Sequence, residues 1–395
     1  MKVVQVVPTL FPTVSYGGGS IVPWELAIAL RARGHNVTIV TTDAGDAGRR
    51  EKAGLSVKDG IRILRIRNLS NKLAFSTKIF TPFTRGPTLR EIIREADVVH
   101  SHDFRTILNL RCNRIALRES VPLIVQTHGT IRTQYNEKMA LKRVYDRFFG
   151  KGIAKRVDAW IALSQVEKEQ LEAYGLPSAR IRILPNGIDT SYFESPPERI
   201  AARVSLGLDS ESRIILFMGR IHPMKGIDLL IDSMPHILAE IPRTKLIVAG
   251  PDDGDQKHLV ERINELGIGP SVSFFGLATG DSKRALFASA DLLALPSLRE
   301  AFPVSILEAA AAGLPIVTTS NSDIANEIND ICGLTTDRNP GSLGKAIVRV
   351  LSNPGLWKRY SDSGRSYAAK YTWDSVIGRY IELYESLLTQ EGDAD

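Results

Sequence analysis

The chain is poor in cysteine, with two in 395 residues, and this argues against two kinds of site. Cys112 and Cys332 lie in different halves and have no partner at metal-ligand spacing, so neither a disulfide framework nor a zinc site is indicated. Long hydrophobic runs are also missing, since no window approaches the roughly 20 apolar residues of a membrane-spanning helix. Met1 to Val4 leads directly into a strand pattern without the layout of a signal peptide. We therefore expect a cytoplasmic protein without redox or metal chemistry.

The alternation of apolar runs and helical segments indicates the fold class. A length of 395 residues exceeds what one hydrophobic core normally serves and predicts two domains. Strand–helix alternation with continuously apolar strands is typical of parallel sheets covered on both faces. The sequence therefore predicts an α/β protein made of two tandem Rossmann-like, doubly wound parallel-sheet domains. The predicted strands cover residues 3–7, 36–41, 61–66, 98–100, 123–127 and 159–162 in the first half, and 214–217, 245–249, 272–275, 292–295 and 315–318 in the second.

The domain boundaries follow from the linker and the tail. We expect a first domain over residues 1–190 and a second over residues 198–370, joined through Ser195-Pro196-Pro197. The polar, helix-rich tail could pack across both units. We expect residues 371–395 to form a helix that crosses back to the first domain.

Positive charge is concentrated in the first half. Residues 1–190 hold 30 Lys and Arg against 17 Asp and Glu, a net +13, whereas residues 191–395 hold 20 against 27, a net −7. Anionic lipid headgroups or a phosphorylated acceptor would suit such a surface. Nucleic acid is not expected, because the basic half lacks the interleaved aromatic residues of stacking platforms. Residues 138–156 predict a basic amphipathic helix that either lies on a membrane or packs against its own sheet.

Two loops at the carboxyl ends of predicted strands have the composition of phosphate sites, and ligands of parallel sheets bind at this edge. Gly17-Gly18-Gly19 opens a helix, where it could bring amides close to a phosphate or simply form a tight turn. Ile21 and Val22 break the G-x-G-x-x-G spacing, which disfavours a dinucleotide. In Gly219-Arg220 and Lys225-Gly226, a guanidinium fork and a flexible ammonium five residues apart could hold a diphosphate.

Acidic and imidazole side chains follow other predicted strands. Glu300 lies in a loop and Glu308 about one turn into an Ala-rich helix, so the pair could grip a nucleotide sugar, or Glu308 could be an ordinary first-turn acid. The imidazole of Thr127-His128-Gly129 could transfer a proton or contact a hydroxyl, or serve only the structure. His100 and His102 end the neighbouring strand together with Asp103, and this cluster could serve an acceptor or cap a helix.

Taken in order, these motifs resemble the retaining glycosyltransferases of family 4, also called group 1. That family has a two-domain GT-B fold with a cleft between the domains. The resemblance spans nearly the whole chain and rests on Gly17-Gly18-Gly19, Thr127-His128-Gly129, Pro185-Asn186-Gly187-Ile188-Asp189, Gly219-Arg220 with Lys225-Gly226, and Glu300 with Glu308.

The resemblance implies transfer of a hexose from a UDP- or GDP-linked donor to a saccharide acceptor, without metal or cofactor and with retention of configuration. The basic first half of the chain, in turn, predicts an acceptor on a lipid carrier or surface glycan, and peripheral contact with the anionic inner face of a membrane. The implied catalytic residues are His128, Glu300, Arg220 and Lys225. The implied donor-binding residues are Gly17, Gly18, Gly19, Arg220, Lys225, Leu277, Glu300, Phe302, Pro303, Val304 and Glu308, and His102 and Asp103 are implied on the acceptor side.

Three departures from the family pattern and two alternatives remain at this point. Ser20 stands where the family often has Glu, and Ser320-Asn321-Ser322-Asp323-Ile324 replaces a more usual glycine- or proline-containing turn. Ala301-Phe302-Pro303 replaces the usual Gly-Phe-Gly of the family, and a proline has no amide to offer a phosphate or sugar oxygen. Asp253-Gly254-Asp255 matches the two-aspartate pattern of metal-dependent transferases with the other common fold. A non-catalytic protein that binds a sugar nucleotide would keep the same fold.

Overall fold

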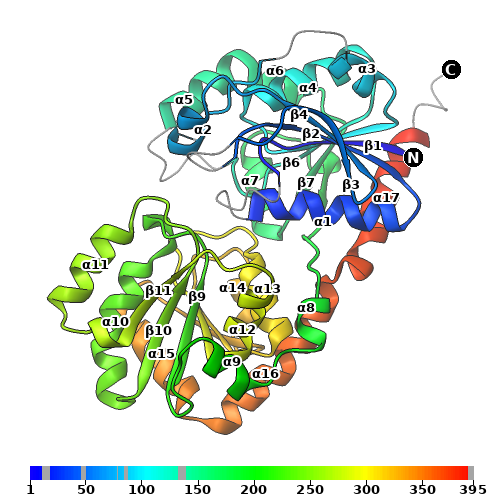
Figure 1. Ribbon diagram of the computed structural model, residues 1–395. Helices are drawn as coiled ribbons and strands as arrows, with labels where there is room; N and C mark the ends of the chain where they lie inside the picture. The colour runs from blue at the N-terminus through cyan, green and yellow to red at the C-terminus, as the bar shows by residue number, and fades with distance from the viewer. Residues whose placement is uncertain (11–17, 46–49, 78, 84–87, 132–138, 390–395) are drawn as a thin grey trace. The chain divides into compact units, whose positions relative to one another are not determined.

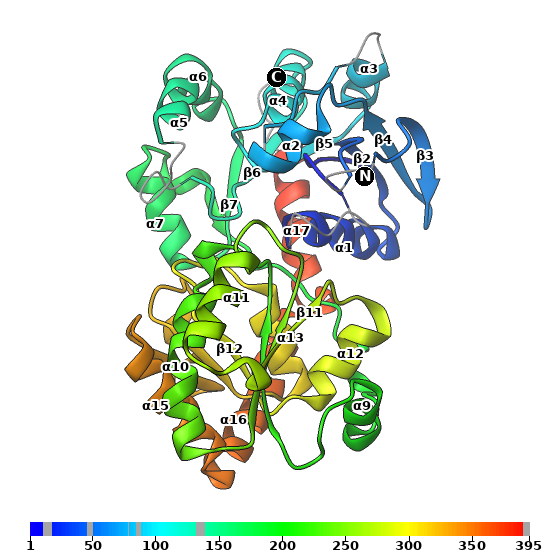
Figure 2. The same cartoon turned by 60° about the vertical axis from the view of Figure 1, so that its left-hand side comes forward.

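The computed structural model describes residues 1–10, 18–45, 50–77, 79–83, 88–131 and 139–389 (Figure 1). The chain divides into two compact units. The first comprises Met1–Gly187 together with Trp373–Asp395, and the second comprises Ile188–Thr372. Each unit is a sheet with helices on both faces, as the two views show (Figures 1 and 2). The predicted pair of Rossmann-like units is confirmed.

The sheet of the first unit has the strand order β3-β4-β2-β1-β5-β6-β7-β8. All neighbouring strands are parallel except β3 and β4, which form an antiparallel hairpin at the edge. The strands that the sequence did not predict are β3, whose residues are all exposed, and the three-residue β8. The bounds are β1 (Lys2–Val6), β2 (Asn36–Thr42), β3 (Gly54–Lys58), β4 (Ile61–Ile66), β5 (Val98–His102), β6 (Leu123–Gln126), β7 (Ala159–Ala162) and β8 (Ile181–Ile183).

The helices of the first unit cover these strands and bury a continuous apolar core. The segment predicted as one helix over residues 138–156 is divided into α5, a π-helical turn η2 and α6. The bounds are α1 (Gly18–Ala32), α2 (Asn71–Thr77), α3 (Thr88–Arg94), α4 (Ile107–Arg118), α5 (Met139–Tyr145), η2 (Asp146–Gly150), α6 (Lys151–Ala154), α7 (Gln165–Ala173), the 3-10 turn η3 (Ser178–Arg180) and α17 (Trp373–Thr389).

The sheet of the second unit has the order β11-β10-β9-β12-β13-β14, and all its pairs are parallel. β12 and β13 are buried along their whole length, which explains their unbroken apolar sequences. The bounds are β9 (Arg213–Met218), β10 (Thr244–Ala249), β11 (Val272–Gly276), β12 (Leu292–Leu295), β13 (Ile316–Thr319) and β14 (Gly333–Thr336). β14 was not predicted from the sequence.

The helices of the second unit include the pair α10 and α15 on one face of the sheet. The bounds are α8 (Ser191–Glu194), α9 (Arg199–Ser205), η4 (Pro223–Lys225), α10 (Ile227–Glu240), α11 (Gln256–Glu265), η5 (Gly269–Ser271), α12 (Gly280–Ser289), α13 (Val304–Ala312), α14 (Ala325–Ile328), α15 (Pro340–Leu351), α16 (Pro354–Ala368) and η6 (Ala369–Tyr371). Within the described ranges, the helices fall short of the combined length and hydrophobicity that crossing a bilayer requires.

The C-terminal helix α17 packs into the first unit beside α1. The indole Nε1 of Trp373 donates to Glu25 of α1 at 2.9 Å. A Cβ atom at Gly187 would lie 2.3 Å from the Trp373 ring, so only glycine fits there. The hydroxyl of Tyr380 bonds to the carbonyl of Pro185 at 3.2 Å. The Pro185-Asn186-Gly187 motif therefore packs against α17 and helps to fix its position in the first unit.

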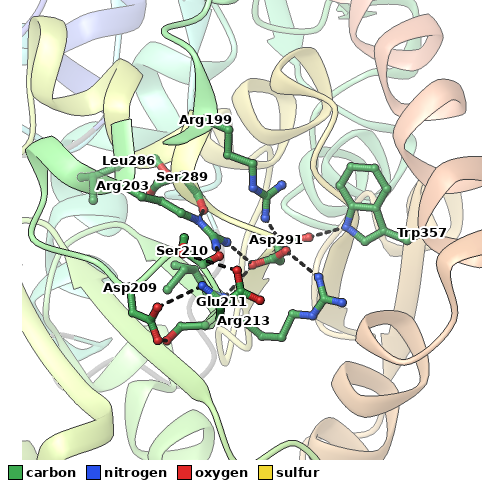
Figure 3. Close-up of polar contacts among 12 residues, drawn as sticks. Arg199, Arg203, Asp209, Ser210, Glu211, Arg213, Leu286, Ser289, Asp291 and Trp357 are labelled. Carbon is green, nitrogen blue, oxygen red and sulfur yellow. Dashed lines mark hydrogen bonds and ion pairs between the residues drawn. The ribbon is translucent and has the colours of Figure 1, made fainter. Parts of the chain in front are cut away.

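A buried carboxylate joins three parts of the second unit at the amino ends of its central strands (Figure 3). Asp291, which precedes β12, accepts from Arg203 of α9 at 2.8 Å and from Arg213 of β9 at 3.4 Å, and Arg199 of α9 also contacts it. The indole of Trp357 in α16 donates to the Asp291 carbonyl at 2.6 Å. This cluster lies at the opposite end of the strands from the ligand-binding edge, so its role is structural.

Candidate active site

The loop after β9 is held against the loop after β10 by its backbone. The amide of Ile221 donates to the Pro251 carbonyl at 2.9 Å, and the amide of Asp253 donates back to Ile221 at 2.9 Å. This pairing brings the guanidinium of Arg220 into contact with the carboxylate of Asp253, and both side chains are mostly buried. Arg220 therefore lies at the carboxyl edge of the sheet, as the sequence predicted.

A tight turn then positions Lys225. His222 caps the turn η4, because its Nδ1 accepts from the amide of Met224 at 3.1 Å. Gly226 has a φ of +67°, and a Cβ atom there would lie 2.1 Å from the Pro296 carbonyl oxygen. This close approach directs Lys225 to Glu300, and the Lys225 ammonium contacts the Glu300 carboxylate.

The loop that carries Glu300 is fixed on both sides. The hydroxyl of Ser297 donates to Glu300 Oε1 at 2.8 Å. The amide of Asp323 donates to the Glu300 carbonyl at 2.8 Å, which anchors the backbone to the loop after β13. Lys225 and Glu300, 75 residues apart in the sequence, are thus neighbours at one edge of the sheet.

Glu308 lies on α13, which begins four residues earlier at Val304 and ends at Gly313 with a left-handed cap. Its carboxylate contacts the ammonium of Lys283, in the first turn of α12. Lys283 was not predicted from the sequence as a site residue. The helix dipole disfavours a lysine in a first helical turn, so its position in the turn that follows β11 could have marked it as a candidate.

The other predicted donor-binding residues of the second unit differ in how far their side chains are exposed to solvent. Leu277 follows β11 and is about half exposed. The ring of Phe302 is buried edge-on against Tyr371, with ring centres 5.6 Å apart, so its side chain serves packing. Pro303 takes the N-cap position of α13 and makes no side-chain cap, and Val304 is the first residue of the helix.

In the first unit, three imidazoles and an amide form a chain behind the ends of β1, β5 and β6, in which Gln5, His100 and His102 are buried and His128 is partly exposed. His102 Nδ1 lies 3.0 Å from His128 Nε2, and His102 Nε2 lies 3.2 Å from Gln5 Oε1. The His100 ring lies tilted against the His102 ring, with ring centres 4.2 Å apart, and its Nδ1 bonds to the hydroxyl of Tyr384 on α17 at 2.8 Å. Within the described residues, α17 is therefore linked to His128 through two other histidines.

The protonation of this chain follows from burial and from Gln5. Burial lowers the pKa of His128 to about 4 and that of His100 to about 3, and it holds the pKa of His102 well below its usual value. All three rings are therefore neutral at pH 7. Because Gln5 Oε1 can only accept, His102 donates from Nε2, and its Nδ1 accepts from Nε2–H of His128. Nδ1 of His128 then keeps a lone pair.

A buried glutamate that sequence analysis missed clamps the loop of His128. Glu167 Oε1 accepts from the Thr127 hydroxyl and from the Gly129 amide, each at 2.6 Å. The clamp holds His128 in the left-handed region with a φ of +47°. Asp103, also left-handed, accepts from the Thr130 hydroxyl at 3.0 Å, and burial raises the pKa of its carboxyl. The acceptor-side candidates His102 and Asp103 thus both adjoin this loop.

The glycine loop is described only in part, because Gly17 lies outside the described residues. Gly18 and Gly19 are the first two residues of α1. The Ser20 side chain is buried in the same turn. The amino end of a helix carries the positive end of the helix dipole, so this end of α1 has the polarity that binds anions.

Each candidate cation of the second unit contacts a carboxylate: Arg220 with Asp253, Lys225 with Glu300 and Lys283 with Glu308. A bound diphosphate would replace the carboxylates as the partner of these cations. Asp253 contacts Arg220, and Asp255 Oδ1 lies 3.5 Å from His258 Nδ1. In the part of the chain that the structure describes, no group of three His, Cys, Asp or Glu side chains is arranged to hold a metal ion.

Two family models match the chain. "Glycosyltransferase Family 4" matches residues 16–192, and "Glycosyl transferases group 1" matches residues 198–367. An uncharacterized glycosyltransferase of Methanocaldococcus jannaschii is 28% identical over 395 residues, which cover 97% of each chain.

Solved structures share the fold at lower identity. Sucrose-phosphate synthase from Thermosynechococcus elongatus has a TM-score of 0.77 at 21% identity, covering 99% of this chain and 100% of that one. HepE of Anabaena, solved with UDP and glucose, has a TM-score of 0.76 at 18% identity, covering 98% of this chain and 100% of that one. The chain belongs to the group 1 glycosyltransferases of family 4 and has their GT-B fold.

Proposed function

We propose that this glycosyltransferase moves a hexose from a UDP- or GDP-linked donor to a saccharide acceptor, with retention of configuration and without a metal ion or cofactor. The observation that supports the proposal is the meeting of Arg220, Lys225, Glu300 and Glu308 at one sheet edge. Cations suit a diphosphate, and carboxylates suit the hydroxyls of ribose and hexose.

The proposed reaction depends on stabilising the leaving diphosphate. Arg220 offers two parallel hydrogen bonds and Lys225 a point charge, so the charge that develops on the phosphate oxygens is met by fixed cations. The C1–O bond to the diphosphate breaks, and the acceptor oxygen bonds to C1 on the same face. Attack on the same face retains the configuration at C1, and the acceptor proton passes to an oxygen of the leaving diphosphate.

The remaining residues hold the donor. Glu308 accepts from the ribose hydroxyls, and Glu300 accepts from hydroxyls of the transferred hexose. His128 contributes a neutral ring and a backbone carbonyl beside the cationic sugar, since burial keeps its pKa low. The Anabaena relative, which holds UDP and glucose, supports a uridine-linked donor by analogy of fold.

The proposed acceptor is a saccharide on a lipid carrier or a growing surface glycan, met at the anionic face of a membrane. The net charge of +13 over residues 1–190 supports this part of the proposal, because anionic headgroups attract basic surfaces.

The test is a panel of UDP- and GDP-hexoses assayed with saccharide acceptors in the presence of a chelator. We expect transfer to persist, and the anomeric configuration of the product, read by NMR, to match that of the donor. Loss of activity with the chelator would favour a metal-dependent transferase. Donor binding without turnover over a broad acceptor panel would favour a non-catalytic binding protein.

A further inference from the structure

The segment from α5 to α6 exposes apolar side chains on the first unit. Phe148 is 68% exposed and Val144 is 52% exposed. They stand four residues apart in consecutive helical turns, α5 and η2. Burying the two side chains against an apolar surface would lower the free energy in proportion to the apolar area removed from water.

The π-helical turn explains why these side chains point outward. Asp146, at the start of η2, is directed inward, where Arg105 donates to its two carboxylate oxygens at 2.9 and 2.8 Å. Both side chains are less than a tenth exposed. A Cβ atom at Gly150 would lie 2.7 Å from Asp146 Oδ1, so glycine makes room for the carboxylate. The ion pair fixes the turn, and the wide turn leaves Phe148 at the surface.

The charge around Phe148 has one sign. The only acid between residues 139 and 156 is Asp146, which Arg105 neutralises in the interior. A surface cavity of about 660 Å³ is lined by Phe148, by the inward-directed Asp146, and by three cations, namely Arg143, Arg147 and Lys151. The guanidinium of Arg114 lies 4.9 Å from the ring centre of Phe149. The full set of basic residues in the segment is Lys142, Arg143, Arg147, Lys151, Lys155 and Arg156.

We propose that this surface docks on an anionic phospholipid bilayer, with Phe148 and Val144 inserted at the headgroup boundary and Arg147 and Lys151 among the phosphates. An aromatic tip ringed by cations matches a continuous negative surface with an apolar interior. The inference rests on the proposed lipid-linked acceptor and assigns the surface that meets the membrane.

The docking surface is also bonded to the loop of His128. The guanidinium of Arg105, which anchors η2 through Asp146, also donates from Nη1 to the Thr130 carbonyl at 2.7 Å. Lys142 of α5 donates to the same carbonyl at 3.1 Å. Docking would therefore place the candidate acceptor-side loop near the bilayer, where a lipid-linked saccharide is held.

The experiment is flotation of the full-length protein with phosphatidylcholine vesicles, with and without phosphatidylglycerol. We expect binding only to the anionic vesicles. Phe148→Ser should weaken it about tenfold, since about 1.4 kcal/mol of burial is a factor of ten. Arg147→Gln and Lys151→Gln should each weaken it about fivefold. The matched control is Val57→Ser on β3, where the replaced side chain is 66% exposed; it should bind as wild type does.

Two readouts separate this inference from the proposed function. Donor hydrolysis without vesicles should be unchanged in Phe148→Ser, and its melting temperature should match that of wild type because the side chain is exposed. Equal binding to neutral vesicles, full binding by Phe148→Ser, or an equal loss in Val57→Ser would each overturn the docking surface. The proposed sugar transfer would stand in all three cases.

Discussion

Nδ1 of His102 lies 3.0 Å from Nε2 of His128, and both rings are neutral because burial lowers their pKa values. The ring of His102 is oriented in turn by Gln5, whose Oε1 lies 3.2 Å from His102 Nε2. The ring of His128 is thus held by a neighbour rather than by solvent. A histidine oriented in this way presents one fixed nitrogen to a ligand.

Replacing His102 with phenylalanine should test this relationship. The substitution keeps a ring of similar size but leaves Nε2 of His128 without its acceptor. We expect the kcat of sugar transfer to fall about 10- to 100-fold, as for other residues that orient a functional group, with little change in the donor KM. His258→Phe removes an exposed histidine on α11 and serves as the control. An unchanged kcat in His102→Phe would show that the orientation of His128 does not matter.

The neutral histidines should make the protein sensitive to acid. In the unfolded chain a histidine has a pKa of about 6.5, whereas folding lowers the pKa of His128 to about 4. The unfolded state therefore binds more protons, and stability is lost as pH falls from about 6.5 to about 4. Melting temperatures measured across this range should drop less steeply in His128→Gln than in wild type. Parallel curves for the two proteins would contradict the lowered pKa.

The arginine cluster around Asp291 should dominate the stability of the second unit. Asp291→Ala would leave Arg203, which is 5% exposed at its side chain, without a counter-charge. Breaking a buried ion pair costs about 3–5 kcal/mol. Asp209→Ala is the control, because its pair with Arg243 is exposed to solvent and contributes little to stability. Calorimetry should show a large loss of melting temperature only for Asp291→Ala, and similar losses in both would exclude the proposed role.

Gly226 should control the position of Lys225. In Gly226→Ala the new methyl group would lie 2.1 Å from the Pro296 carbonyl, so the turn must move. We expect UDP to stabilise this variant much less against heat than it stabilises wild type. Gly207→Ala is a matched control, since Gly207 has nearly the same φ of +65° and nothing within 4 Å of its Cβ position. Full stabilisation of Gly226→Ala by UDP would remove Lys225 from the donor site.

Much of the fold could be predicted from periodicity, because most strands are buried on both faces and read as unbroken apolar runs. β3 escaped prediction since all its residues are exposed, and its pattern therefore carries no sign of burial. β8 has the sequence Ile-Arg-Ile and β14 the sequence Gly-Leu-Thr-Thr, so neither strand reads as an unbroken apolar run. The π-helical turn depends on a contact between Arg105 and Asp146, 41 residues apart.

The candidate site likewise has residues that could be predicted from the sequence and residues that could not. Arg220, Lys225, Glu300 and His128 could be selected because each follows a predicted strand at the edge where ligands bind. Their partners could not, since the contact of Lys283 with Glu308 joins two helices. Glu167 lies 40 residues from the threonine that it binds. Such pairings depend on how the elements pack, so the local sequence does not show which residues meet.

Titration calorimetry of UDP binding to the full-length protein, in a buffer with a chelator, tests whether Arg220 and Lys225 hold the donor diphosphate without a metal ion. Wild type should bind UDP in this buffer. Arg220→Ala and Lys225→Ala should each weaken binding about 10- to 100-fold, because a hydrogen bond to a charged group contributes about 1.5–3 kcal/mol. Arg243→Ala and Lys257→Ala, which remove exposed cations of the same unit, should bind as wild type does. Full affinity in the first two variants, or binding that requires a divalent ion, would contradict the proposed donor site.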